Sequence, residues 1–135
     1  MIDQIGFEPI ISDEEKSDVI PYDLSEKKIV VMDNQECIFL KIQKISYIAG
    51  EGSYSTIYLR NGKKFVVSKN IKDFVGKLNT TSFFRIHKSY LINVNCIDKY
   101  VKTDGGYLVM KNGGIIPVSV RKKYILSQLV KNLSL

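Results

Sequence analysis

The sequence predicts an all-β domain with short helices, preceded by a separate acidic segment. Short apolar segments recur after residue 27, and Gly, Asn and Asp residues separate them, which is typical of antiparallel strands. Two later stretches instead show the spacing of an amphipathic helix. A chain of 135 residues with 44% hydrophobic residues is long enough to bury one core, so we expect a single folded domain.

The first 26 residues differ in charge from everything that follows. They hold eight of the 14 acidic residues and one of the 20 basic residues, which gives a net charge of −7. Pro9 and Pro21 interrupt the segment and no apolar period is sustained, so we expect residues 1–26 to be a flexible acidic leader. Residues 27–135 carry a net charge of +13, which favours a nucleic-acid partner over a merely solvated lysine-rich surface.

Eight segments are predicted strands, joined largely by hairpin turns. They are 28–32, 36–40, 45–49, 54–60, 63–67, 96–102, 107–111 and 115–118. In segment 54–60, Tyr54, Thr56 and Tyr58 fall on one face, and Ser55, Ile57 and Leu59 fall on the other. Asn61-Gly62 is a strong hairpin signal, and the two Gly-Gly turns at 105–106 and 113–114 favour a meander.

Two helices complete the predicted domain. The first is expected to be capped by Ser68 and to stop near Asn79. Its apolar stripe is Ile71, Phe74, Val75 and Leu78. The closing helix is expected to be capped by Ser119, with Ile125, Leu129 and Leu133 on its apolar face.

Several classes of function are disfavoured. No apolar run approaches the ~18 residues of a membrane span, and the acidic N-terminus is unlike a secretory signal, so a cytoplasmic protein without membrane insertion is expected. Cys37 and Cys96 are expected to be buried, reduced thiols, although a disulfide stays open. A lone histidine, His87, gives no metal-ligand set, and nothing suggests a cofactor or catalytic residues, so we expect no enzyme activity.

Three groups of residues stand out as candidate contacts. Arg121, Lys122 and Lys123 would occupy the first turn of the closing helix, where cations are unfavourable unless an external anion neutralises them. Arg85 to Lys88 is a second basic group, in which alternation places Arg85 and His87 on one side and Lys88 at the end of the strand. Ser53 and Tyr54 follow Gly50-Glu51-Gly52, a turn that allows a projecting loop whose hydroxyls could donate to a phosphate or a base edge.

With these groups in view, the chain resembles the LytTR family of DNA-binding domains from about residue 28 to residue 132. Residues 83–93 read FFRIHKSYLIN and are similar to the family's F-x-R-x-H-[RK]-S-[YF]-[LV]-[VI]-N signature. Residues 48–54, 67–69, 105–107 and 117–123 support the resemblance in the same order and spacing.

The resemblance implies an elongated domain of about ten short strands in three antiparallel sheets, with loops that enter successive major grooves. It implies base contacts by Ser53, Lys88 and Arg121, and phosphate contacts by Ser68, Lys69, Lys122 and Lys123. The family often carries Asn or His near Ser53, so the shorter serine is expected to read bases less specifically. The family domain usually follows a phospho-receiver domain or membrane segments, so here we expect that switch to be absent or to lie on another protein.

The expected function is therefore sequence-specific binding of double-stranded DNA at promoter direct repeats, by a bacterial transcription regulator. A second copy bound in tandem and a regulatory partner protein are further expected partners. The alternative is a general single-stranded nucleic-acid binder, in which some of the eight tyrosines would stack on bases. The leader is expected to weaken DNA binding slightly by competing for Lys88 and for the cations at 121–123.

Overall fold

The computed structural model describes residues 27–78 and 82–135, and the acidic leader and Asn79 lie outside the described residues. The strands are β1 (Lys28–Asp33), β2 (Glu36–Lys41), β3 (Ile45–Glu51), β4 (Tyr54–Leu59), β5 (Lys64–Val67), β6 (Phe83–His87), β7 (Tyr90–Asn93), β8 (Ile97–Val101), β9 (Tyr107–Met110) and β10 (Ile115–Pro117). Within the described residues, the α-helices are α2 (Ile71–Lys77) and α3 (Lys123–Leu133), and the 3₁₀ turns are η1 (Ile42–Lys44), η2 (Val94–Cys96) and η3 (Val120–Lys122). Each segment predicted as a strand forms one, with ends shifted by at most two residues.

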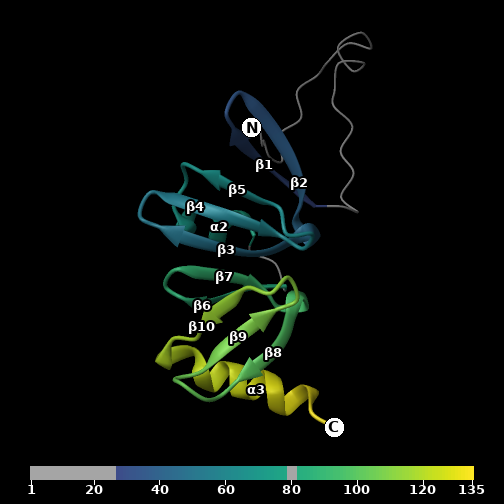
Figure 1. Ribbon diagram of the computed structural model, residues 1–135, viewed down its shortest axis with the longest axis vertical. Helices are drawn as coiled ribbons and strands as arrows, with labels where there is room; N and C mark the ends of the chain where they lie inside the picture. The colour runs from purple at the N-terminus through teal and green to yellow at the C-terminus, as the bar shows by residue number, and fades with distance from the viewer. Residues whose placement is uncertain (1–26, 79–81) are drawn as a thin grey trace, which may run out of the picture.

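The strands form three antiparallel sheets, as the family resemblance implied. Their orders are β1-β2, β5-β4-β3-β7-β6 and β10-β9-β8. The sheets follow one another along the long axis of the molecule, with α3 at the end farthest from β1 (Figure 1). The five-stranded sheet is the centre of the fold, because a core lies on each of its faces.

The alternation predicted for β4 decides which side chains enter which core. Ser55, Ile57 and Leu59 are buried, whereas Tyr54, Thr56 and Tyr58 on the opposite face are exposed or half-buried. The first core packs one face of the sheet against the β1–β2 hairpin and α2. Ile45, Ile48 and Ile57 at its centre are each 0% exposed, and each such side chain contributes about 1.5–3 kcal/mol through burial.

The second core lies between the five-stranded sheet, the three-stranded sheet and α3. It contains Tyr47, Ile86, Leu108 and Leu126 among its buried residues. The rings of Tyr47 and Tyr58 stack with centroids 4.4 Å apart and 17° between their planes. The shared core joins the three-stranded sheet and α3 to the five-stranded sheet.

The predicted start of the first helix is wrong by two residues. Asn70, not Ser68, caps α2: its side chain accepts from the Asp73 backbone N–H, and the Asp73 carboxylate accepts from the Asn70 backbone N–H. This reciprocal arrangement satisfies two backbone donors and so outcompetes Ser68 as a cap. In the predicted stripe, Ile71, Phe74 and Leu78 are buried, but Val75 is 38% exposed.

The predicted form of the closing helix also needs correction. Ser119 precedes the 3₁₀ turn η3 and makes no side-chain capping bond, and α3 begins only at Lys123. The buried residue of α3 is Leu126, with Leu129 packed partly beside it, whereas Leu133 is 74% exposed. The apolar face therefore has the i, i+3 spacing of Leu126 and Leu129.

The two cysteines are free thiols in different surroundings. Cys96 is buried as predicted, but Cys37 is exposed, so the prediction of two buried thiols is wrong for Cys37. Cys37 lies opposite Met32 in the β1–β2 ladder, on the face of the hairpin turned away from the core.

Candidate nucleic-acid interface

The tip of the β3–β4 hairpin is a two-residue loop, Gly52-Ser53, between the paired residues Glu51 and Tyr54. Gly52 has a φ of +62°, which is typical of the first central residue of a tight hairpin turn and favours glycine. Ser53 is exposed and Tyr54 is 55% exposed. Both predicted contact residues therefore stand at a projecting end of the sheet.

The tip of the β6–β7 hairpin is the loop Lys88-Ser89. The Ser89 backbone N–H donates to Nδ1 of His87 over 3.0 Å, and the Arg85 guanidinium donates to the Lys88 carbonyl oxygen. The His87 ring also meets the edge of Tyr90, at a centroid distance of 5.6 Å. His87 thus has a structural role, and half-buried Arg85 holds the loop from which Lys88 projects into solvent.

These two tips lie next to each other. β3 pairs with β7, with Ala49 opposite Tyr90, and the Gly50 backbone N–H donates to the Ser89 carbonyl oxygen over 2.8 Å. A Cβ atom on Gly50 would come within 2.9 Å of the Ile71 side chain, so this position also needs a residue without a side chain. The Ser53 and Lys88 loops are consequently fixed side by side.

A third loop, residues 68–70, joins the same end of the sheet. The buried Ser55 hydroxyl donates to the Lys69 carbonyl oxygen over 2.7 Å, which ties the segment after β5 to the start of β4. Ser68 and Lys69 are exposed. Ser55 was not predicted to have this role, although its place at a buried position of an alternating strand was a usable signal, because a buried hydroxyl needs a partner.

The fourth contribution comes from η3. The Ser119 backbone N–H donates to the Ile86 carbonyl oxygen over 3.2 Å, so η3 starts beside the end of β6. Arg121 is exposed there, next to Val120, which is 80% exposed. The prediction that three cations share the first helical turn is wrong, because Arg121 and Lys122 belong to the 3₁₀ turn and Lys123 alone lies in α3.

Lys122 and Lys123 are less free than Arg121. The Lys122 Nζ atom lies 5.3 Å from the ring centroid of Phe84, which is a cation–π contact. Lys123 is half-buried, and its Cε atom lies 3.6 Å from the position that a Cβ on Gly106 would take. Both side chains therefore pack along the protein surface while their ammonium groups can still meet an anion.

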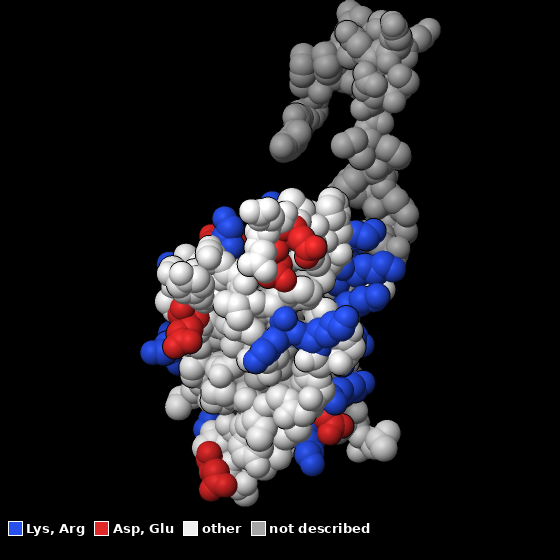
Figure 2. Space-filling view, turned by 45° about the horizontal axis from the view of Figure 1, so that its top comes forward, with Lys and Arg blue, Asp and Glu red and all other residues white. Residues whose placement is uncertain are grey.

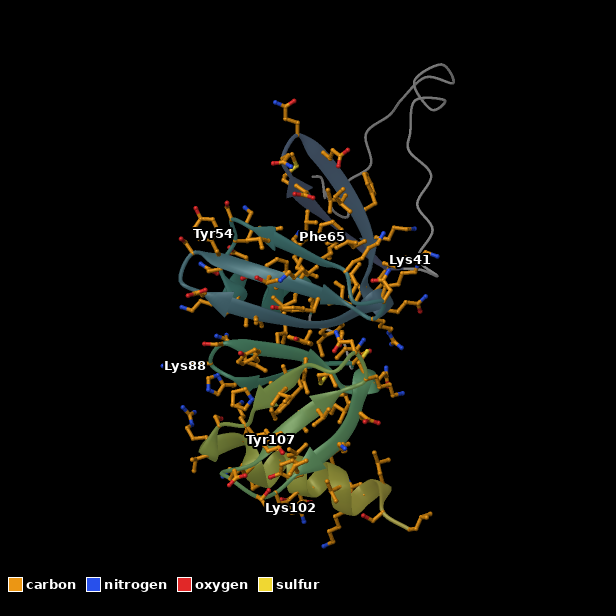
Figure 3. The ribbon with its side chains drawn as sticks, in the orientation of Figure 1. Lys41, Tyr54, Phe65, Lys88, Lys102 and Tyr107 are labelled. Atoms are coloured by element: carbon orange, nitrogen blue, oxygen red, sulfur yellow. The ribbon has the colours of Figure 1, made fainter. Side chains whose placement is uncertain are left out.

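The four loops gather on one side of the molecule. In Figure 1 the β3–β4 tip, the β6–β7 tip and the start of η3 all lie at the left edge of the view, and Figure 3 shows Tyr54 and Lys88 on that side. Residues that are far apart in the sequence come together here because β3 pairs with β7 across 40 residues of chain. This side therefore presents hydroxyls and cations that a ligand could contact. It belongs to a segment, residues 27–135, whose net charge is +13.

Residues 27–78 and 82–135 contain no group of three or more His, Cys, Asp or Glu placed to hold a metal ion. In the same described ranges, no helix is long and apolar enough to cross a membrane.

Two known proteins are similar to this chain in sequence. Sensory transduction protein LytT of Oceanobacillus iheyensis is 32% identical over 108 residues, which is 77% of this chain and 40% of that protein. An uncharacterized response regulatory protein of Vibrio cholerae is 25% identical over 75 residues, covering 53% of this chain and 29% of that protein. The chain thus spans less than half the length of either relative.

A solved structure and a family model agree on the domain type. A solved LytTr DNA-binding domain from Bacillus cereus superposes with a TM-score of 0.62 and 23% identity, over 80% of this chain and 97% of that one, and so shows the fold. The family model described as the LytTr DNA-binding domain matches residues 35–131, a range that contains all four loops. The chain therefore belongs to the LytTR family of DNA-binding domains.

Proposed function

We propose that this protein is a bacterial, cytoplasmic transcription regulator that binds promoter direct repeats in double-stranded DNA through loops placed in the major groove. The observation that carries the proposal is the gathering of Ser53, Lys88 and Arg121 on one side of the five-stranded sheet. All three side chains are exposed and stand on short, hydrogen-bonded loops. Rigidly placed loops suit readout of base edges, which requires a fixed register on the duplex.

Arg121 is the proposed principal base-reading residue. Its guanidinium can donate two parallel hydrogen bonds to O6 and N7 of a guanine in the major groove. Lys88 is proposed to contact guanine or phosphate, and Ser53 makes a weaker base contact, since its hydroxyl is short. The 3₁₀ turn, its bond to β6 and the neighbouring Lys122–Phe84 contact support Arg121 in this role.

The remaining residues are proposed to hold the phosphate backbone. Lys69 and Ser68 would contact one strand from the loop tied to Ser55, and Tyr54 would donate its hydroxyl beside Ser53. The other proposed phosphate contacts are Arg85, Lys122 and Lys123. Arg85 contributes mainly by holding the Lys88 loop, because its guanidinium already donates to the Lys88 carbonyl.

Direct repeats imply a second copy of the protein bound in tandem on the same face of the duplex. Both relatives named above carry names of signalling proteins, which supports an input signal that reaches this domain from another domain or a partner protein. The function proposed is binding, and catalysis forms no part of it.

The packing of three tyrosines against one another disfavours base stacking on them, which favours duplex DNA over single strands. Tyr47 stacks on Tyr58, and its ring centroid lies 6.4 Å from that of Tyr90, so these three rings pack against one another. A ring that is already stacked inside the protein cannot serve as a platform for a base. The loops, with their cations and hydroxyls, are therefore the stronger candidate surface.

Selection of bound duplexes from a random library, at near-physiological salt, tests the proposal. The expected result is a recovered motif that occurs twice in the same orientation. Recovery of single-stranded contaminants, or of duplexes without any shared motif, would contradict sequence-specific duplex binding. The Arg121→Ala variant is the matched control, and it should lose preference at one position of the motif.

A further inference from the structure

A second group of basic side chains lies at the opposite end of the five-stranded sheet from the four loops. We call it the basic end, and it consists of Lys27, Lys28, Lys41, Lys44, Arg60, Lys63 and Lys64. Figure 3 shows Lys41 on the side opposite Tyr54 and Lys88, and Figure 2 shows Lys and Arg gathered on the right of the view. The proposed DNA contacts use none of these seven residues.

Backbone contacts hold the basic end together. Lys28 lies opposite Lys41 in the β1–β2 ladder, and the Ile42 N–H donates to the Lys27 carbonyl oxygen over 2.9 Å. The Arg60 N–H donates to the Lys44 carbonyl oxygen over 2.9 Å. η1 thus connects the start of β1, the end of β2 and the β4–β5 turn, and gathers cations from three parts of the sequence.

The basic end has no acidic residue of its own. The segments 27–28, 41–44 and 60–64 contain no Asp or Glu, and six of the seven cations are exposed. The like charges of the six exposed cations raise the local positive potential, which attracts a polyanion. A partner of negative charge therefore suits this surface.

The acidic leader is joined to the chain at this end. Residues 1–26 carry a net charge of −7 and connect directly to Lys27, whose carbonyl is fixed by Ile42. Glu26, Asp23 and Asp18 are the acids nearest to Lys27 in the chain. Because the effective concentration of a tethered group is highest for short tethers that can reach the site, these acids meet the basic end first.

The DNA-facing loops are a poorer target for the leader. They lie the length of β3 away, about 20 Å at ~3.3 Å per residue. That distance is about two Debye lengths at physiological salt, so the attraction of Lys88 and Arg121 for the leader is largely screened at Lys27. The competition for these loops expected from the sequence alone is thus less favourable than binding at the basic end.

We propose that the basic end binds the acidic leader of the same chain, with residues 1–26 as its occupant. The bound leader covers cations that would otherwise hold any nucleic acid, and it leaves the four loops open. It therefore lowers non-specific binding more than specific binding. This last consequence rests on the proposed function, whereas the intramolecular contact does not.

The contact is tested first without DNA, in the full chain. The leader variant combines Asp18→Asn, Asp23→Asn and Glu26→Gln, and amide shifts are compared with the unmodified protein by NMR at low salt. The expected shift changes fall on residues 41–44 and 60–64 and vanish near 1 M salt, where the Debye length is about 3 Å. Changes that fall instead on residues 52–54 and 88–89, or changes nowhere in the domain, would overturn the proposal.

The second test measures affinity for a duplex of scrambled sequence. If the contacts between the leader and the basic end have dissociation constants of about 0.1–1 mM at an effective concentration of about 1 mM, the leader variant should bind this duplex twofold to tenfold more tightly. The basic-end variant combines Lys44→Gln, Lys63→Gln and Lys64→Gln. Added to the leader variant, it should abolish the gain.

A matched control removes the same charge elsewhere. It combines Lys99→Gln, Lys102→Gln and Lys131→Gln, all exposed and all in the part of the chain that forms the three-stranded sheet and α3. Added to the leader variant, this control should preserve the gain. Equal effects of the basic-end and control triples would show that only net charge matters and would overturn the proposal. Failure of the proposed function would appear separately, as an absence of duplex binding with the NMR result intact.

Discussion

At the scale of single residues, exposure separates the cations whose side chains extend into solvent from those that already contact other parts of the protein. Arg121 is exposed on η3, whereas neighbouring Lys122 lies half-buried with its Nζ 5.3 Å from the Phe84 ring centroid. Adjacent residues of the same charge are therefore expected to behave differently when each is removed.

The Arg121→Ala change is expected to weaken binding to the selected duplex by about 1–3 kcal/mol and to relax preference at one base pair. Lys122→Ala should weaken all duplexes about equally. It should also lower the free energy of unfolding by about 0.5–1 kcal/mol through loss of the cation–π contact. Binding titrations on cognate and scrambled duplexes, with thermal unfolding beside them, check both changes. A uniform loss of affinity in Arg121→Ala would argue against base reading.

Tyr47 gives the domain a pH dependence on the alkaline side. Burial, with the nearby Tyr58 and Tyr90 hydroxyls, raises the pKa of Tyr47 from 10.0 to about 12. Below pH 10 the Tyr47 hydroxyl is neutral in both the folded and the unfolded chain, so its ionisation does not reduce the stability of the folded state there. Between about pH 10 and pH 12 the unfolded chain ionises first, and stability falls.

Tyr47→Phe removes this titration while keeping the ring that stacks on Tyr58. The melting temperature of the variant should therefore fall less steeply than that of the unmodified protein between pH 10 and pH 12. Tyr124→Phe, at a site 68% exposed, is the matched control and should change the slope little. If the melting temperatures of the unmodified protein and Tyr47→Phe fell equally between pH 10 and pH 12, the titration of Tyr47 would not be the cause of the fall.

At the scale of elements, local sequence patterns predicted the strands well and the helix ends poorly. The alternation of β4 specifies its buried face, since side chains point to opposite sides in turn. Ser68 and Asn70 are both good caps only two residues apart, and the choice depends on Asp73 completing the reciprocal pair. Likewise, the Asn61-Gly62 turn was expected to hold two residues. In the structure, Leu59 and Lys63 are hydrogen-bonded across Arg60, Asn61 and Gly62.

Asn70→Ala tests the capping pair of α2. The change leaves the Asp73 backbone N–H without its partner and is expected to lower the free energy of unfolding by about 0.5–2 kcal/mol. Asn70→Ser, which keeps a capping oxygen, should retain most of the stability. Denaturant unfolding measures both variants, and equal stabilities for Ala and Ser would mean that Ser68 or water replaces the cap.

At the scale of the whole molecule, the gathering of the loops was beyond local prediction. Ser53, Lys88 and Arg121 were each marked by charge or turn chemistry, and Lys69 by the family resemblance, but nothing in the neighbouring residues shows that they share one side. That placement follows from the strand order β5-β4-β3-β7-β6, in which β3 and β7 pair across a long stretch of chain. Pairings of this kind depend on how whole faces pack, so the family resemblance supplied what periodicity could not.

The charge of the folded domain predicts a strong salt dependence. If about five phosphates are neutralised, the logarithm of the binding constant should fall with the logarithm of salt concentration at a slope near −4 to −5. Lys69→Ala should reduce the magnitude of this slope by about one, because it removes one of the proposed phosphate contacts. Titrations between low and physiological salt provide the measurement, and an affinity that does not vary with salt would contradict a polyanion partner.

The bond from the Gly50 N–H to the Ser89 carbonyl has a consequence for how the domain can diversify. It joins the two hairpin tips through main-chain atoms alone, over 2.8 Å, so no side-chain exchange at Ser53 or Lys88 can remove it. The distance between the two tips therefore does not depend on which side chains occupy positions 53 and 88. New sequence preferences could arise, or be engineered, by exchanging these two side chains on an unchanged frame.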